Sequence, residues 1–215
     1  QVLVYTGGIL YHEKVDAFTD YGGLLGYNMQ FRNNWGFEIN FDFADSRDEG
    51  IRYTTYNVNF SSWFNTNPNL HANVYAGYSR TYNFSRDYLA YYSWAGSFLE
   101  YLLLNTLEIG TSADMFIEGN PDGNIEDVTY NARPYFSVTP INNLNIRVYF
   151  DNLFVRSSNR SERTIFGLLF SYNFSPKSWI YFALNELRDR PEPEFQQLRV
   201  AERASVFKIK YLFYF

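Results

Sequence analysis

The chain has 215 residues, of which 46% are hydrophobic and 21% aromatic, with no cysteine and a net charge of -5. The absence of cysteine excludes disulfides and thiolate chemistry, and the acidic balance argues against nucleic acid as a partner because phosphate binding relies on clustered Lys and Arg. No segment approaches the ~20 apolar residues of a membrane-spanning helix. The 20 Tyr and 21 Phe residues favour strands instead.

The first predicted strands alternate large apolar and polar side chains. They cover residues 2–11, 22–31 and 35–43, and in the third the apolar side chains alternate with Glu38 and Asp42 among others. Successive side chains of a strand point to opposite faces. Two carboxylates on one face of such a strand are hard to place in a dry core, so we expect that face to be wet or internally paired.

The same alternation continues through the rest of the chain and predicts twelve strands in all. Pro134 forfeits a ladder hydrogen bond within one of them, which predicts a bulge or an edge there. Residues 97–100 fit a helix capping box, so 97–104 is either a short interfacial helix or continued strand. The remaining predicted strands are 56–60, 70–78, 88–102, 107–118, 130–138, 144–151, 164–174, 179–186 and 204–215.

The connections between these strands fall into two alternating classes. Short periplasmic turns that alternate with longer outer loops are typical of outer-membrane barrels, and this pattern would place both termini on the periplasmic side. The short joints are near 32–34, 63–69, 103–106, 139–143 and 175–178, whereas the longer ones are near 12–21, 44–51, 80–87, 119–129, 156–163 and 187–203.

The last nine residues place Tyr211, Phe213 and Phe215 on one face, and the chain stops on an aromatic residue. This ending resembles the terminal signal by which bacterial outer-membrane barrels are delivered to their assembly machinery. We therefore predict an all-β fold, a single antiparallel transmembrane β-barrel domain over 1–215 with about twelve strands, or the C-terminal part of a larger barrel. Because Gln1 follows no leader, we interpret the chain as processed or as a C-terminal piece.

The segment from Tyr172 onward carries a further resemblance. An aromatic strand, a Ser-Pro turn, an apolar strand ending in Asn-Glu, an Arg-Asp loop and a final aromatic strand follow one another. This order is similar to the close of large bacterial outer-membrane proteins that pair an N-terminal family 9 carbohydrate-binding-like module with a C-terminal barrel. The resemblance implies an outer-membrane location more than an activity. The matching residues are Ser175, Pro176, Asn185, Glu186, Arg188 and Asp189.

Charged residues gather on the inferred inner face of the barrel. They either form charge rings that set the selectivity of a water-filled pore or form a paired network that fills the lumen, and we favour the network because narrow barrels are filled by side chains. These lumen-lining residues are Glu38, Asp42, Glu108, Asp114, Arg133, Arg147, Asp151, Lys208 and Lys210.

Three tryptophans near strand ends, Trp35, Trp63 and Trp179, are predicted to face outward as membrane-interface anchors. The loop 120–124 offers oxygen ligands for Ca²⁺, but it lacks the spacing of a calcium loop and we interpret it as a turn. No metal or cofactor is expected. His71 beside a serine such as Ser79 or Ser93 would suit a hydrolase, although no spacing ties them together.

The leading functional hypothesis is a passive one. We expect either a small-solute channel or the membrane anchor of a larger surface or secretion assembly in the bacterial outer membrane. Its partners would be the lipid bilayer with lipopolysaccharide, the assembly machinery and other subunits of a membrane complex. An outer-membrane hydrolase is the alternative, and a secreted soluble β protein is a third.

Overall fold

The computed structural model describes residues 1–14, 18–190 and 197–212, and these residues form twelve β-strands. All twelve predicted strands are present, and most are longer than predicted. Their bounds are β1 Val2–Glu13, β2 Phe18–Gln30, β3 Trp35–Asp48, β4 Ile51–Asn67, β5 Leu70–Asn83, β6 Tyr88–Leu103, β7 Leu107–Gly119, β8 Ile125–Ile141, β9 Leu144–Val155, β10 Arg160–Ser175, β11 Ser178–Asp189 and β12 Arg199–Lys210.

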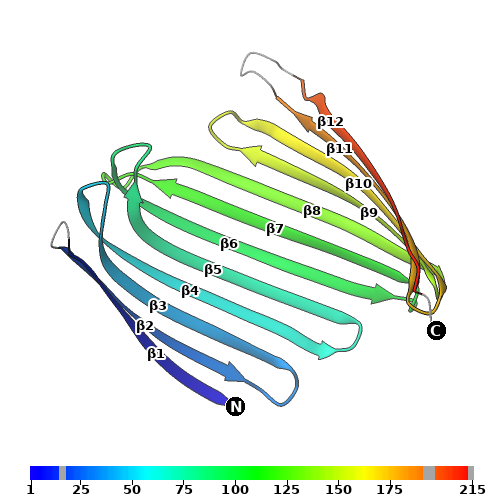
Figure 1. Ribbon diagram of the computed structural model, residues 1–215, viewed down its shortest axis with the longest axis horizontal. Helices are drawn as coiled ribbons and strands as arrows, with labels where there is room; N and C mark the ends of the chain where they lie inside the picture. The colour runs from blue at the N-terminus through cyan, green and yellow to red at the C-terminus, as the bar shows by residue number, and fades with distance from the viewer. Residues whose placement is uncertain (15–17, 191–196, 213–215) are drawn as a thin grey trace. The chain divides into compact units, whose positions relative to one another are not determined.

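The strands follow one another in the sheet in chain order, from β1 to β12 (Figure 1). The chain divides into two compact units, residues 1–97 with 114–129 and residues 98–113 with 130–215. In the first unit β1 to β5 pair antiparallel with their chain neighbours, and in the second β9 to β12 do so. The all-β, twelve-stranded antiparallel prediction is therefore confirmed. The described residues contain no helix that could span a bilayer.

Each unit has one polar and one apolar face, and the register fixes which residues share them. In the first unit Asn28 lies opposite Glu38, whereas Leu25 lies opposite Phe41. We call the face of Glu38 the polar face of this unit and the face of Phe41 its apolar face. In the second unit the polar face carries Arg147 and the apolar face carries Phe166.

The connections differ from the predicted loops. Strands β3 and β4 continue to the pair Asp48 and Ile51, so the expected loop over 44–51 is a two-residue turn. Glu49 and Gly50 both have positive φ, as a type I′ hairpin turn requires. The ladder between β3 and β4 is longer than predicted. Arg52 donates to Asp45 across this strand pair at 2.8 Å, so two charged residues that we had assigned to a loop pair with each other.

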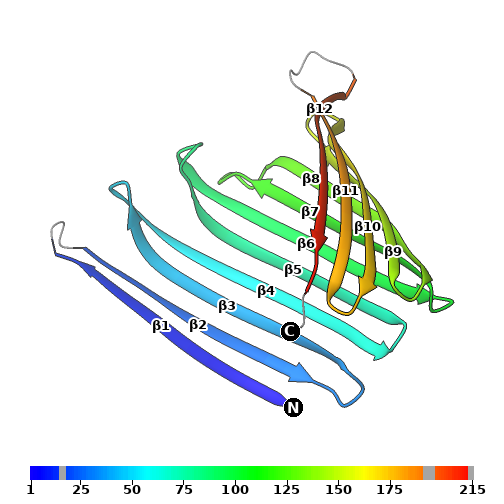
Figure 2. The ribbon, with the colours of Figure 1, turned by 45° about the vertical axis from the view of Figure 1, so that its right-hand side comes forward.

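Much of the length predicted as loop is therefore strand, and only four residues, 84–87, connect β5 to β6. Hairpin connections alternate between the two ends of the strands (Figure 2). The N-terminal amino group donates to the carbonyl of Gln30 at 2.8 Å, beside the short connection after β2. The Leu212 amide donates to Ser178 Oγ at 3.2 Å, beside the turn between β10 and β11. Gln1 and Leu212 thus lie at the ends of their units that carry the connections predicted to be short. In the first unit, however, the connection 31–34 is not shorter than the two-residue turn after β3, so the predicted difference in length is not found there.

The structure decides between strand and helix after Ser97 and shows the course of the chain at Pro134 and at the end of β12. Strand β6 runs to Leu103, so continued strand, and not a helix, follows Ser97. Leu104 and Asn105 then turn the chain with φ of 55° at both residues. Strand β8 passes through Pro134 without interruption. Strand β12 ends at Lys210, before the predicted limit, and the ring of Tyr211 stacks on Phe174 at 6.1 Å, whereas Phe213 and Phe215 lie outside the described residues.

The chain buries almost no apolar side chain. Among the described residues, Ala90 and Val128 are the buried hydrophobic ones. Large side chains of the apolar faces remain exposed, for example Phe41 at 44% and Phe166 at 45%. A water-soluble protein rarely leaves contiguous apolar surface of this kind uncovered. The apolar faces therefore need a partner other than water.

We expect the full chain to remain monodisperse only in detergent. Dilution of detergent below its micelle concentration should cause aggregation, because the apolar faces would then meet water. Size-exclusion chromatography with light scattering measures this directly. A monodisperse, β-rich chain in detergent-free buffer would contradict the conclusion that the apolar faces need a partner other than water.

Candidate functional site

The polar faces carry a repeated arrangement in which a tyrosine lies across a glycine of the next strand. Tyr5 of β1 lies opposite Gly26 of β2, which lies opposite Asn40 of β3. The Tyr5 hydroxyl passes over Gly26 and donates to Asn40 and to Glu38 Oε1, the latter at 2.6 Å. A Cβ on Gly26 would overlap the Tyr5 ring. We call this three-strand arrangement a tyrosine bridge.

The second unit repeats the tyrosine bridge in the same register. Tyr149 of β9 lies opposite Gly167 of β10, and Gly167 lies opposite Asn185 of β11. The Tyr149 hydroxyl donates to Asn185 Oδ1 at 2.7 Å, and its ring occupies the place of the missing glycine Cβ.

Two more tyrosine bridges end on carboxylates. In the first unit Tyr75 crosses Gly96 and donates to Asp114. In the second unit Tyr135 crosses Gly110 and donates to Glu100 at 2.6 Å.

The geometry of a tyrosine bridge follows from strand spacing. Neighbouring strands are about 4.8 Å apart, so a side chain that reaches the second strand must lie along the sheet. Glycine makes this approach possible because it has no Cβ. The ring is thereby held against the sheet and does not project away from it.

Arginines pack on two of these tyrosines in the second unit. The Arg147 guanidinium lies 4.7 Å from the Tyr135 ring centroid and donates to Glu108 at 2.7 Å. Arg133 lies 5.8 Å from the Tyr149 ring centroid, and its Nε donates to Asp151 at 2.8 Å. A cavity of about 460 Å³ opens beside these groups, lined by Phe98, Ser112, Arg133, Tyr135, Arg147, Tyr149 and Leu169.

The other predicted charged residues also lie on the polar faces. In the first unit Asp42 accepts from Asn57, and Glu38 and Asp114 accept from the bridging tyrosines. In the second unit Lys208 lies opposite Tyr181, and Lys210 lies opposite Trp179. Within each unit the predicted charges therefore share one face, whereas their role in lining a lumen stays a prediction.

The tryptophans do not all face the same way. Trp35 lies on the apolar face of its unit, where its ring stacks between Phe31 at 3.9 Å and Phe64 at 6.1 Å. Trp63 lies opposite Gly36 and covers it on the polar face. Trp179 shares the polar face with Lys210. Trp63 and Trp179 therefore lie on the polar faces of their units, unlike Trp35, because strand parity and not position near a strand end sets the face. Their role as membrane-interface anchors stays a prediction.

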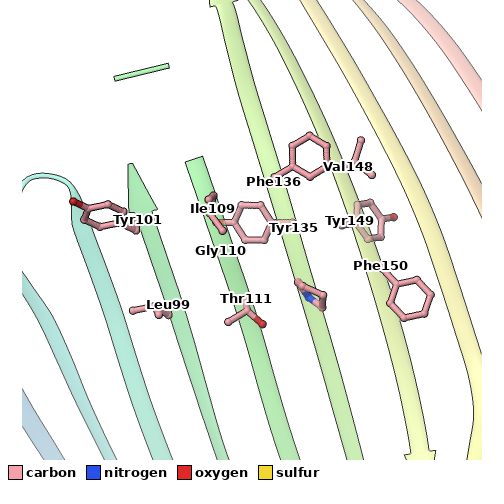
Figure 3. A pocket seen from close by; sticks show the side chains of 11 residues that line it. Leu99, Tyr101, Ile109, Gly110, Thr111, Tyr135, Phe136, Val148, Tyr149 and Phe150 are labelled. Carbon is pink, nitrogen blue, oxygen red and sulfur yellow. The ribbon is translucent and has the colours of Figure 1, made fainter. Parts of the chain in front are cut away.

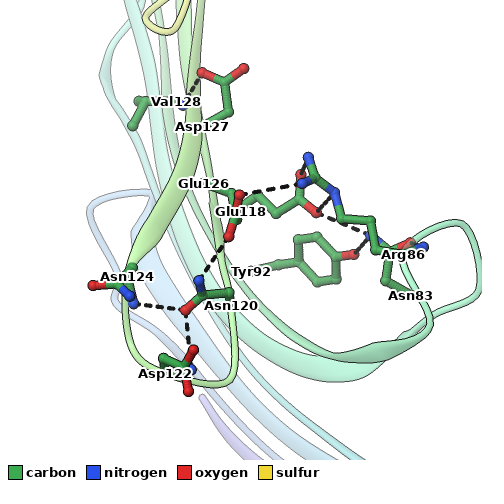
Figure 4. A network of polar contacts seen from close by, with 10 residues as sticks. All are labelled: Asn83, Arg86, Tyr92, Glu118, Asn120, Asp122, Asn124, Glu126, Asp127 and Val128. Atoms are coloured by element: carbon green, nitrogen blue, oxygen red, sulfur yellow. Dashed lines mark hydrogen bonds and ion pairs between the residues drawn. The ribbon is translucent and has the colours of Figure 1, made fainter.

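A polar network holds the end of β5 to β7 and β8 in the first unit (Figure 4). Arg86 forms ion pairs with Glu118 at 3.1 Å and with Glu126 at 3.3 Å. Asn120 Oδ1 accepts from the backbone amides of Asp122 and Asn124, at 3.1 and 2.9 Å. This oxygen stabilises the turn, in line with the turn interpretation of 120–124. No metal-binding group of His, Asp or Glu occurs in the described part of the chain.

A smaller ion-pair group lies at the start of β10 in the second unit. Glu162 contacts Arg160 at 2.9 Å and Arg190 at 3.2 Å. Glu162 therefore connects the start of β10 to Arg190, directly after β11.

Neither Ser79 nor Ser93 lies in a catalytic position beside His71. Its Nδ1 lies 3.0 Å from Asn65 Oδ1. Ser79 is eight residues farther along the same strand, which is about 26 Å. Ser93 occupies the opposite parity from Gly96, and hence lies on the apolar face, whereas His71 shares the polar face with Tyr75. Neither serine forms a dyad with His71.

The apolar face of the second unit has a hollow of about 600 Å³ (Figure 3). Leu99 and Tyr101 from β6, Thr111 from β7, and Val148 and Phe150 from β9 line it. Pro134 also lines this hollow, so the proline ring faces the apolar side. None of the residues that line the hollow is Asp, Glu, Lys, Arg or His.

Comparisons with known proteins give a weak structural likeness. No protein-family profile matches the chain, and no curated protein sequence matches it. The NanC porin is 11% identical with a TM-score of 0.40, over 86% of either chain. The KdgM porin in complex with disordered oligogalacturonate is 11% identical with a TM-score of 0.38, over 87% of this chain and 91% of that chain. At these scores the comparisons assign no family.

We expect Gly167→Ala to destabilise the chain by about 2 kcal/mol, because the new Cβ overlaps the Tyr149 ring and breaks the tyrosine bridge to Asn185. Gly7→Ala is the matched control, since a Cβ there meets nothing within 4 Å. Urea unfolding in phospholipid vesicles, followed by Trp fluorescence, measures both free energies. Equal effects of the two substitutions would show that the bridges contribute nothing to stability.

Proposed function

We propose that this chain forms a transmembrane β-barrel of the bacterial outer membrane and conducts small solutes. The observation that carries the proposal is the tyrosine bridge. Four tyrosines, Tyr5, Tyr75, Tyr135 and Tyr149, lie along the sheet and not away from it. If the polar faces surround a lumen, these rings form its wall and leave its centre to water.

The apolar faces support the membrane location. Trp35 and Phe64 stack at the short-connection end of the first unit, and Phe43 lies opposite Tyr56 near the other end. Eight residue steps separate Trp35 from Phe43, about 27 Å along the strand. With the ~40° tilt typical of barrel strands this is about 20 Å across the bilayer, close to the apolar band between two aromatic girdles.

The polar faces support passage of solutes. Arg133 of β8 is paired with Asp151 of the neighbouring β9, and Arg147 of β9 is paired with Glu108 of β7, two strands away. Their guanidinium groups are held on tyrosine rings. Paired and stacked charges of this kind stay close to the wall. The 460 Å³ cavity between them is open to a small polar solute. Fixed charges on a pore wall set its selectivity.

An anchor for a larger assembly is the second form of the proposal. The resemblance to barrels that follow a family 9 carbohydrate-binding-like module rests on the order of features near the C-terminus. Ser175 and Pro176 stand at the turn between β10 and β11, and Asn185 and Glu186 lie in the second half of β11. Such an anchor would share the location and the partners of the channel, but its lumen would be closed.

We expect the purified chain to produce discrete conductance steps in planar bilayers, because the tyrosine bridges leave the centre of the lumen free. Incorporation is verified independently by protease protection in vesicles. Stable incorporation without any conductance would contradict the channel and favour the anchor.

We expect Arg147→Gln to raise the cation-to-anion permeability ratio of that channel, because Glu108 then faces the lumen without its cation. Reversal potentials in a salt gradient measure this ratio. Arg52→Gln is the control, since Arg52 lies on the apolar side of β4 and is paired with Asp45. An unchanged ratio in the Arg147 variant would place Glu108 and Arg147 outside the conduction path.

A further inference from the structure

Arg80 is a cation on the apolar face of the first unit. It lies opposite Tyr56, in line with Tyr78 two residues earlier on β5. Its guanidinium lies 5.8 Å from the Tyr56 ring centroid and 5.9 Å from that of Tyr91. Tyr56, Tyr78 and Tyr91 also pack on one another, with centroid separations of 6.1 and 6.3 Å. Arg80 is thus held within an aromatic cluster.

No anion among the described residues neutralises this guanidinium. Among the residues that the structure describes, Arg80 has ring contacts but no ion pair, and its buried Nε has no hydrogen-bond partner. Neighbouring arginines differ in this respect. Arg52 is paired with Asp45, and Arg86 is paired with Glu118 and Glu126. A half-buried cation without an anion is costly, which points to an external anionic partner.

The depth of Arg80 restricts what that partner is. Phe43 and Tyr56 form the aromatic girdle at the end of the strands opposite Trp35, and Arg80 lies beside Tyr56 in that girdle. Aromatic girdles lie at the level of the lipid headgroups. Under the proposed topology this end faces the outer leaflet. The guanidinium is therefore placed at the depth of the headgroups of that leaflet.

A hollow of about 560 Å³ lies beside the arginine. Tyr78 and Tyr91 line it together with Ser93 and Ile117, and the connection 119–125 borders it. The wall formed by the strands is aromatic and apolar. The rim, formed by the connection, carries the amides of Asn120 and Asn124 and the carboxylate of the exposed Asp122. An acyl chain fits the wall and a sugar headgroup fits the amide rim.

We propose that Arg80 binds a phosphate group of an outer-leaflet glycolipid of the lipopolysaccharide type, whose acyl and sugar portions occupy this hollow. The guanidinium pairs with phosphate in a charge-assisted, forked geometry, and the two tyrosine rings hold it in orientation. The proposal rests on the membrane location proposed above, but it does not require an open lumen. A negatively charged phosphate supplies the counter-ion that Arg80 lacks among the described residues.

Native mass spectrometry of the full chain in detergent tests this, with phosphorylated lipid A and its dephosphorylated form as probes. Wild-type protein should retain the phosphorylated lipid, and Arg80→Gln should reduce that retention about tenfold, the effect of one lost charged hydrogen bond. Arg52→Gln, which removes a cation already paired with Asp45, should retain the lipid as the wild type does.

The remaining outcomes separate the alternatives. Equal retention by Arg80→Gln, or equal retention of the dephosphorylated lipid, would overturn the proposal. Displacement of the lipid by inorganic phosphate would also overturn it in favour of a soluble phosphate ligand, whereas resistance to displacement supports a lipid. Failure of the wild type to enter vesicles would defeat both this site and the membrane location. Retention of lipid without conductance would support the site and defeat only the channel.

Discussion

The contact of a tyrosine ring with the bare backbone of a glycine is the interaction on which the polar faces depend. A strand pair offers little room beside a Cβ, but it offers enough for a ring where glycine stands, as at Gly26 and Gly167. The ring then spans to the second strand and its hydroxyl finds an acceptor there. One side chain thereby connects three strands and fixes their mutual register. The alternation of polar and apolar residues alone fixes register only within a pair of strands.

This constraint also explains why the polar faces tolerate their charges. Arg147 needs both a carboxylate and a surface against which its guanidinium can lie, and the bridged Tyr135 ring provides that surface. Without Gly110 the ring would stand away from the sheet, and the arginine would lose its support. Polar order on one face and the uncovered apolar side chains on the other are consequently two results of the same strand register.

The alternation of residue types predicted the twelve strands and the shared face of the charged residues assigned to a lumen, because both depend on a period of two that is local in sequence. It did not predict the tyrosine bridges. Tyr149 and Gly167 are 18 residues apart, and only the hairpin register between β9 and β10 brings them opposite each other. The loops were overestimated for a related reason, since Asp45 and Arg52 look like loop residues until their pairing across the strands is known.

Arg80 is a residue that the alternation of polar and apolar positions does not explain. Its position assigns it to the apolar face, where a charged residue counts against the pattern, and sequence alone offers no reason for it. The structure supplies the reason in two parts, because Tyr56 and Tyr91 cover the guanidinium and the described protein provides no counter-ion. A charge that breaks the pattern would be most expensive near the bilayer centre, whereas at girdle depth the lipid headgroups can pair with it and lower that cost. An arginine at that depth with unused donors is therefore better explained by the lipid beside it than by the protein around it.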